Sequence, residues 1–322
     1  MKLIVQIPCF NEEPTLGQTI AEIPRRIAGI DRVEVLVIDD GSTDATAEVA
    51  RRSGADHIVR HIRNQGLARA FRTGLDACLG LGADIIVNTD ADNQYAGAAI
   101  PELVRPILEG RADIVIGDRC PGRLPHFSAG KRRLQRLGSR VVRRLSRFSA
   151  SAVPDAVSGF RALSRSAALK LNIVSSFSYT IEMLIQAGHE RMAVASVPVA
   201  VNPGTRASRL FRSVPQFLVQ SLATMVRTYT MYKPLRVFTG LGLACVLAGL
   251  LPVVRFLFYY LQGQGSGKIQ SLVLGGVLLI AGFVSLLIGV IADLIAFNRS
   301  LLETVLEKVR RLEAERPPPP MP

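Results

Sequence analysis

Asp84-Ile85-Ile86-Val87-Asn88-Thr89-Asp90-Ala91-Asp92-Asn93-Gln94 is the most informative stretch of the chain. Its short apolar run predicts a buried strand that delivers the carboxylates of Asp90 and Asp92 at its end. Ligands of open α/β sheets bind at that edge. Two carboxylates there can hold one divalent cation, which Mg²⁺ or Mn²⁺ would share with substrate phosphates. The alternative is a polar turn after a strand, because Asp and Asn favour turns.

Strand-like and helix-like runs alternate over the first 117 residues. This rhythm predicts an α/β fold with a mostly parallel sheet, right-handed crossovers and flanking helices. No G-x-G-x-x-G motif follows the first strand, so a dinucleotide-binding domain is not supported. The predicted strands are Leu3–Ile7, Val33–Ile38, His57–Val59, Ile85–Val87 and Ile114–Ile116. The predicted helices are Thr15–Ile27, Ala45–Arg52, Leu67–Leu79 and Ile100–Leu108.

The predicted strands end in polar residues. Pro8-Cys9-Phe10-Asn11-Glu12-Glu13 follows the first strand, and Asp39-Asp40-Gly41-Ser42-Thr43-Asp44 follows the second. Helix capping explains Ser42, Thr43 and Asp44. It does not explain Asp39 and Asp40, whose like charges need donors such as the N–H and hydroxyl groups of a nucleoside. Arg63-Asn64-Gln65-Gly66 then opens a helix whose backbone N–H groups could face a phosphate.

The C-terminal third predicts a membrane anchor. The apolar runs 237–261 and 272–297 each exceed the roughly 20 residues needed to span a bilayer. Their short connector makes them a hairpin, and the basic residues at its outer ends place both ends in the cytoplasm by the positive-inside rule. The N-terminus has no signal peptide, so the catalytic part is expected in the cytoplasm. We therefore predict a multi-pass protein of the cytoplasmic membrane, with domains at 1–210, 211–235, 236–298 and 299–322.

The net charge of +13 lies in the middle of the chain, where residues 118–236 carry 20 basic and four acidic side chains. A basic block beside a membrane segment points to anionic lipid headgroups or a phosphate-bearing substrate. Residues 128–148 show an apolar stripe within a basic helix, which is typical of a helix in the membrane interface. A solvated helix packed on the core is the alternative. No nucleic-acid-binding module is present, so nucleic acid is not an expected partner.

Together these motifs resemble the family-2 glycosyltransferases with the GT-A fold, and specifically the polyprenyl-phosphate glycosyltransferases that include dolichol-phosphate mannose synthase. The resemblance covers about residues 3–210, and the hairpin extends it to members with C-terminal membrane helices. It rests on four motifs in order: Pro8-x-Phe10-Asn11-Glu12-Glu13, Asp39-Asp40-Gly41-Ser42-Thr43-Asp44, Asp90-x-Asp92-x-Gln94 and Ser158-Gly159-Phe160-Arg161.

The resemblance implies a role for each matched position. The nucleotide would be bound by Pro8, Phe10, Asn11, Glu12, Asp39, Asp40 and Asp90. The divalent cation, Mg²⁺ or Mn²⁺, would be held by Asp90, Asp92 and Gln94. The acceptor phosphate would be gripped by Arg119, Arg161, Arg206 and Arg209, although the loop 206–209 departs from the commoner Gly-x-Ser-Lys form. Asp155 stands at the family's proposed catalytic carboxylate, and Asp92 is the second predicted catalytic acid.

The implied activity is inverting, metal-dependent transfer of a sugar from a UDP- or GDP-sugar to a polyprenyl phosphate. Because the acceptor phosphate is already anionic, Asp155 would orient it or remove a residual proton. Two alternatives stay open: a family-2 transferase acting on another membrane acceptor, such as a diacylglycerol or a glycan lipid, and a non-catalytic membrane scaffold. The sequence leaves the sugar, the nucleotide, the metal and a homo-oligomeric state open.

Overall fold

The computed structural model describes residues 1–119, 129–146, 148, 152–174, 179–202, 214–263 and 267–315, without the side chains of 129–137, 214–218 and 314–315. The chain divides into two compact units. The first comprises Met1–Met225 with Val305–Pro322, and the second comprises Val226–Thr304.

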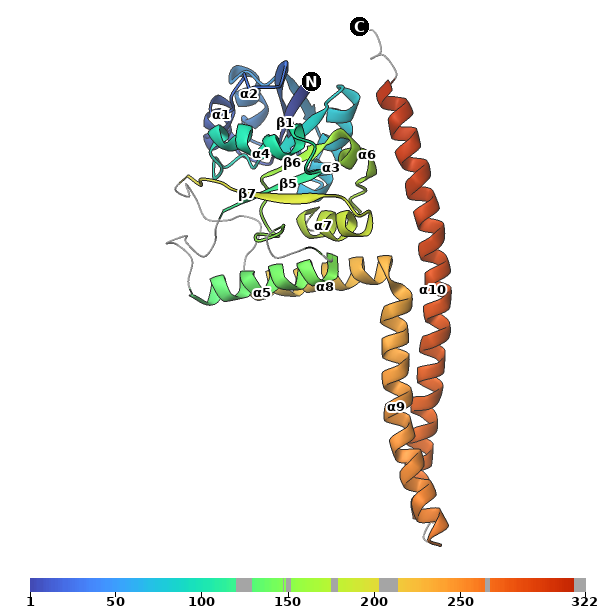
Figure 1. Ribbon diagram of the computed structural model, residues 1–322. Coiled ribbons are helices and arrows are strands. Elements are labelled where there is room, and N and C mark those ends of the chain that lie inside the picture. The colour runs from blue at the N-terminus through green and yellow to red at the C-terminus, as the bar shows by residue number, and fades with distance from the viewer. Residues whose placement is uncertain are drawn as a thin grey trace. The chain divides into compact units, whose positions relative to one another are not determined.

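A seven-stranded sheet forms the centre of the first unit (Figure 1). The strand order is β3-β2-β1-β4-β6-β5-β7, and every pair is parallel except the two pairs that β6 makes with β4 and β5. The order reverses between β1 and β4, which is where doubly wound sheets bind ligands. The strands are β1 (Lys2–Cys9), β2 (Arg32–Asp39), β3 (His57–Arg60), β4 (Ile85–Asn88), β5 (Ile114–Asp118), β6 (Arg161–Ser164) and β7 (Val194–Pro198).

Helices cover both faces of this sheet. Leu16, Ile20 and Leu103 of α1 and α4 pack into one apolar cluster, and Phe71 and Met183 of α3 and α7 pack into the other. Burial on both faces explains why β1 and β2 are apolar along nearly their whole length. The helices of this unit are α1 (Glu13–Ala21), α2 (Thr46–Arg52), α3 (Leu67–Gly80), the short 3₁₀ helix η1 (Gly97–Ala99), α4 (Ile100–Leu108), α5 (Ala129–Ser146), α6 (Arg165–Lys170) and α7 (Tyr179–His189).

The predicted strands and the mostly parallel sheet are confirmed. One predicted helix is too long, because α1 ends at Ala21 rather than Ile27. Pro24 explains the early end, since the residue before a proline disfavours the helical conformation. A short strand was expected after the 155–160 loop, but the antiparallel direction of β6 and the short helix α6 were not.

The basic helix α5 packs on α7 through small side chains. Ser139, Val142 and Ser146 are buried, and a side chain at Gly188 of α7 would collide with the Ser146 carbonyl. Val141, which belongs to the predicted apolar stripe, stays 38% exposed. The helix thus contacts the core with one face and leaves an apolar residue outside, and its place in a membrane interface remains a prediction.

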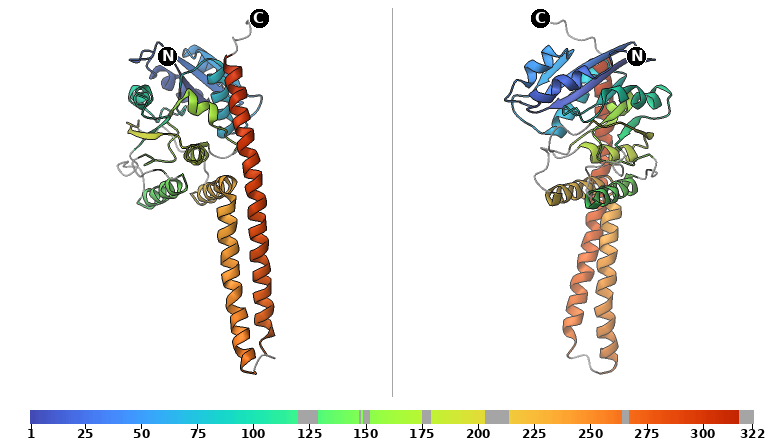
Figure 2. Two further views of the ribbon diagram at one scale, coloured as in Figure 1. Left: turned by 45° about the vertical axis from the view of Figure 1, so that its right-hand side comes forward. Right: turned by 90° about the vertical axis from the view of Figure 1, so that its left-hand side faces the viewer.

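The second unit contains two long apolar helices, α9 (Pro234–Leu261) and most of α10 (Ile269–Glu315), and it begins within α8 (Val214–Tyr232). Both views of Figure 2 show α9 and α10 side by side, and backbone contacts at Gly242–Gly282 and Gly249–Gly275 hold them close. Each is long and apolar enough to cross a membrane. Only 11% and 17% of their most apolar segments are buried, so neither resembles the core helix of a soluble protein.

Helix α10 continues well past its apolar segment. The sequence analysis ended the predicted membrane span at 297 and began a separate region at 299, but the structure continues across this boundary in one helix of 47 residues. No glycine or proline stands between Gly289 and Pro317 to interrupt it. Its last turns belong to the first unit, where Arg310 donates to the Leu171 carbonyl at 2.7 Å and pairs with Asp76 at 3.0 Å.

Candidate functional site

The ends of β1, β2 and β4 carry the predicted nucleotide and metal residues on interlocked loops. The loop after β1 is bonded to the loop after β2: the Asn11 N–H donates to the Ser42 hydroxyl and the Glu12 N–H donates to the Thr46 hydroxyl, both at 2.9 Å. Pro8 is buried within β1, whereas the Phe10 side chain is 40% exposed. Of these two, Phe10 is the one that offers a surface to a nucleotide base.

The neighbouring acids Asp39 and Asp40 have different surroundings, although both are buried. Asp39 Oδ1 accepts a hydrogen bond from the Ser42 N–H at 2.8 Å. Asp39 Oδ2 lies 3.0 Å from the Arg60 Nε, but no hydrogen bond reaches this oxygen from the described residues. Its interaction with the protein is thus the ion pair with Arg60 rather than a hydrogen bond.

Asp40 is fully engaged by the protein. Its Oδ1 accepts from the Gln65 N–H at 2.9 Å and lies 2.6 Å from the His61 Nδ1. Its Oδ2 accepts from the Gly66 N–H at 2.8 Å. Asp40 thus fixes the 63–66 loop at the start of α3, and its predicted part in nucleotide binding would act through the shape of that loop.

Asp90 and Asp92 lie in a tight turn after β4. Asn93 adopts a left-handed conformation with φ of 56°, and the Gln94 N–H donates to Asp92 Oδ1 at 3.1 Å. The turn is held from outside by two residues that the sequence did not single out. Glu22 accepts from the Asn93 amide at 2.8 Å, and the Asn202 amide donates to the Asn93 carbonyl at 3.0 Å.

The Asp90 carboxylate lies in largely buried surroundings. Desolvation and then the charge of Asp92 raise the pKa of Asp90 to about 7. A Cβ placed on Gly159 would stand 2.9 Å from both carboxylate oxygens, so the glycine is what leaves room for them. The described residues contain no set of three acidic, histidine or cysteine side chains that could enclose a metal by themselves.

This donor set fits a cation that is shared with a substrate. Two nearby carboxylates and the amide oxygen of Gln94 are hard oxygen ligands of the kind that Mg²⁺ and Mn²⁺ prefer. A cation would also offset the repulsion that raises the pKa of Asp90. With so few protein ligands, the remaining coordination positions would be filled by water or phosphate oxygens.

Asp155 and Arg119 form a buried ion pair. The Arg119 Nε and Nη2 donate to the two Asp155 oxygens at 2.7 and 3.1 Å. The Asp155 side chain is fully buried, and that of Arg119 is 12% exposed. The predicted catalytic acid and one predicted phosphate-binding residue therefore lie in direct contact, and Asp155 has a fixed orientation.

Arg161 is placed differently from the prediction that it faces the acceptor. It is fully buried, and its guanidinium donates to the carbonyls of Ala156, Ser158 and Thr180 at 2.8–2.9 Å. Burial lowers the pKa of Arg161 to about 10. In this structure it ties the 156–158 loop to α7. The predicted acceptor residues Arg206 and Arg209 lie outside the described residues.

A buried polar network beneath the site also escaped the sequence analysis. The Asn88 amide donates to the Gly159 carbonyl and to the Tyr179 hydroxyl, both at 2.9 Å, and accepts from the Gln6 amide at 2.9 Å. The Gly159 N–H donates to the Tyr95 hydroxyl at 3.2 Å. These bonds hold Gly159 against Asp90. The one signal in the sequence was the polar Asn88 in an otherwise apolar strand.

Comparison with known proteins agrees with this geometry. Residues 4–171 match the model of glycosyl transferase family 2. Glycosyltransferase AglJ of Haloferax volcanii is 27% identical over 95% of this chain and 96% of its own. The dolichol-phosphate mannosyltransferase of Pyrococcus furiosus is 30% identical over 62% of this chain and 56% of its own.

A similar solved structure is the glucosyl-3-phosphoglycerate synthase of Mycobacterium tuberculosis in complex with Mn²⁺, UDP and glucosyl-3-phosphoglycerate. It is 25% identical, with a TM-score of 0.55, over 71% of this chain and 78% of its own. The family match at residues 4–171 covers more than half of the chain and includes the sheet, the paired loops and the Asp90–Asp92 turn. The protein therefore belongs to glycosyl transferase family 2.

Proposed function

We propose that this protein transfers a sugar from a UDP- or GDP-sugar to a polyprenyl phosphate at the cytoplasmic face of a membrane, with inversion and with a divalent cation. The observation that carries the proposal is the combination, in one chain, of the Asp90–Asp92 turn with two helices of membrane-spanning length. Similarity to a dolichol-phosphate mannosyltransferase and to a dolichyl-phosphate hexose transferase supports the lipid acceptor.

The donor side of the site divides into three tasks. Asp39 Oδ2, which has an ion pair with Arg60 but no hydrogen bond from the described residues, would accept a hydrogen bond from the base or ribose, and Phe10 would lie against the base. Asp90, Asp92 and Gln94 would hold Mg²⁺ or Mn²⁺ on the diphosphate. When bound, the cation would offset the charge that develops on the leaving diphosphate. Solved relatives with Mn²⁺ and UDP-glucose support this assignment.

The acceptor side depends on Arg119 and Asp155. A phosphate monoester is anionic at neutral pH and needs positioning more than deprotonation. Arg119 can attract it with the face of the guanidinium that Asp155 does not occupy, while Asp155 holds that guanidinium in a fixed orientation. Asp155 could also take a residual proton, and an Asp155→Asn variant with near-native turnover would exclude that step.

A second candidate acceptor is a small water-soluble phosphate. The solved relatives include complexes with phosphoglyceric acid and glycerol 3-phosphate, which are phosphorylated but have no lipid tail. The same arginine and carboxylate could serve either acceptor. The two helices of membrane-spanning length favour the lipid acceptor, because an enzyme that acts on a water-soluble acceptor does not need a membrane anchor.

A transfer assay tests the proposal. The full chain in detergent is given undecaprenyl phosphate, Mg²⁺ or Mn²⁺, and a panel of radiolabelled UDP- and GDP-sugars, with Asp92→Asn as the control. We expect one donor to label the lipid phase only when the cation is present and only in the wild type. Release of nucleotide without labelled lipid would support the proposed donor site and contradict the proposed lipid acceptor. If no donor in the panel reacts in folded protein, the proposed transfer from a UDP- or GDP-sugar is contradicted.

A further inference from the structure

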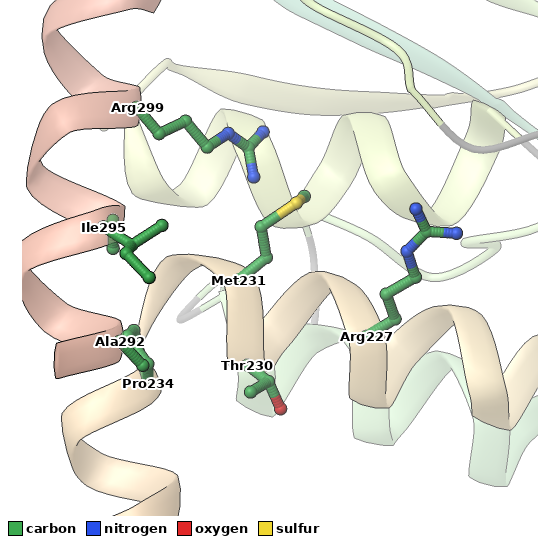
Figure 3. A pocket seen from close by; sticks show the side chains of 8 residues that line it. Arg227, Thr230, Met231, Pro234, Ala292, Ile295 and Arg299 are labelled. Carbon is green, nitrogen blue, oxygen red and sulfur yellow. The ribbon is translucent and has the colours of Figure 1, made fainter. Parts of the chain in front are cut away.

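A pocket lies in the second unit at the end of the helix pair opposite the connector (Figure 3). Two sets of residues with the same spacing line it. The first is Arg227, Thr230, Met231 and Pro234, and the second is Ala292, Ile295, Ala296 and Arg299. The second set follows the i, i+3, i+4, i+7 pattern of one helix face, whereas the first comes from the end of α8 and, at Pro234, from the start of α9. The small Ala292 and Ala296 leave the space open, and its volume is about 480 Å³.

The pocket combines an apolar wall with two cationic ends. Ile295, Met231 and Pro234 supply apolar surface, and Figure 3 shows the Arg299 side chain reaching over the tip of Met231. Arg227 is exposed on α8. Among the residues that the structure describes, no carboxylate lines the pocket. An occupant that is mostly apolar and carries one negative charge would match this lining.

Arg299 is held in place but keeps one donor unused. Its Nε and Nη2 lie 2.9 and 2.7 Å from the Glu303 carboxylate, and Nη2 also donates to the Tyr232 hydroxyl at 2.8 Å. The Tyr232 ring lies 4.4 Å from the guanidinium carbon. Its Nη1 is buried and has no hydrogen-bond partner among the described residues. A buried guanidinium N–H without a partner is costly, and an anionic oxygen would satisfy it.

We propose that this pocket binds one anionic glycerophospholipid. Its phosphate would lie between Arg227 and Arg299, and the start of an acyl chain would lie along Pro234, Ile295 and Ala296. Arg299 marks the point where the apolar segment of α10 gives way to charged residues, which is the depth at which lipid phosphates lie beside a membrane helix. The volume falls within the range of roughly 300–1,000 Å³ typical of small-ligand sites and is too small for another helix.

This lipid is distinct from the acceptor. Every lining residue belongs to the unit Val226–Thr304, whereas Asp90, Asp92, Asp155 and Arg119 belong to the other unit. The lining also contains no acid or base that could act on a sugar or a phosphate. The lipid would therefore stabilise the helix pair, and the inference does not depend on the transferase activity.

The test measures lipid retention on the full chain in detergent by native mass spectrometry. Dioleoyl-phosphatidylglycerol and dioleoyl-phosphatidylcholine are titrated separately. Ala296→Leu fills the pocket, and Arg227→Gln removes an exposed charge from its rim. Ala281→Leu and Arg236→Gln are the matched controls, because they make the same changes at exposed positions that do not line the pocket.

We expect one phosphatidylglycerol per chain, bound in preference to phosphatidylcholine. Each pocket variant should weaken this binding about tenfold, as expected for one lost charged hydrogen bond or an occluded site, and each control should bind as the wild type does. Equal binding of the two lipids, or equal losses in pocket and control variants, would overturn the proposal. Displacement of phosphatidylglycerol by an equimolar amount of undecaprenyl phosphate would also overturn it, by assigning the pocket to the acceptor lipid.

Discussion

Replacing Asp40 with asparagine tests whether this acid stabilises the fold, in contrast to its neighbour Asp39, which we propose binds the nucleotide. Asp40 and Asp39 are adjacent and both buried, yet only Asp40 has both of its oxygens satisfied by the protein. Three donors converge on it, namely His61 Nδ1 and the N–H groups of Gln65 and Gly66. An asparagine of the same size has one acceptor oxygen, so it cannot serve all three.

The magnitude follows from this geometry. Whichever way the amide is oriented, its NH₂ group faces at least one N–H donor that then lacks a partner in a buried site. Each such loss costs about 1–3 kcal/mol, and more for a bond to a charged group, so we expect a loss of about 2–5 kcal/mol in the free energy of unfolding. For a unit of this size that corresponds to a fall in Tm of roughly 5–15 °C.

Thermal unfolding of the full chain in detergent measures the effect, with Asp39→Asn as the matched control. The control keeps an oxygen for the Ser42 N–H and loses the ion pair between Oδ2 and Arg60, whose side chain is 57% exposed, so its Tm should fall less. Its affinity for the donor nucleotide should instead fall about tenfold, because one charged acceptor is lost. If Asp40→Asn melts with the wild type, or if Asp39→Asn is the less stable of the two, the assignment of these two acids is wrong.

Three further predictions concern the metal turn and the end of α10. Gly159→Ala should lower Mn²⁺ affinity measured by calorimetry by at least about tenfold, because the new methyl group displaces the Asp90 carboxylate; binding equal to wild type would contradict the close approach. Mn²⁺ affinity should fall as the pH drops through about 7, because a proton then competes for the Asp90 carboxylate, and a flat profile between pH 6 and pH 8 would exclude this. Arg310→Ala should lower the Tm more than Asp76→Asn does, because Arg310 is buried and donates to the Leu171 carbonyl whereas the Asp76 side chain is 47% exposed; equal melting would show that this contact is weak.

The alternation of apolar strands and amphipathic helices was enough to predict the sheet, because strands covered on both faces must be almost wholly apolar. The two membrane-length helices followed from length and composition in the same way. The antiparallel direction of β6 was not predictable, because its four residues, 161–164, carry no signal of direction and depend on the neighbours β4 and β5. The length of α10 exceeds the prediction because a change from apolar to charged residues does not end a helix where no helix-breaking residue stands.

The sequence predicts which residue types follow each strand in the candidate site. It does not predict the direction in which their side chains point. The sequence indicated that Asp90 and Asp92 follow a strand, and the structure places both in one turn. It could not show that Arg161 points into the core, because an arginine after a loop looks the same whether it binds a ligand or backbone carbonyls. Glu22 and Asn202 support the metal turn from distant parts of the chain, which no local pattern can reveal.

The most direct measurement is a competition between a lipid and a water-soluble acceptor for the same labelled donor. Undecaprenyl phosphate and 3-phosphoglycerate are offered together to the full chain in detergent with Mn²⁺ and the donor found active in the panel, and the label is partitioned between organic and aqueous phases. We expect the label in the organic phase, with Asp92→Asn giving none in either. Label that accumulates in aqueous glycosyl-phosphoglycerate, with the organic phase empty, would contradict the polyprenyl-phosphate acceptor while leaving the glycosyltransferase site intact.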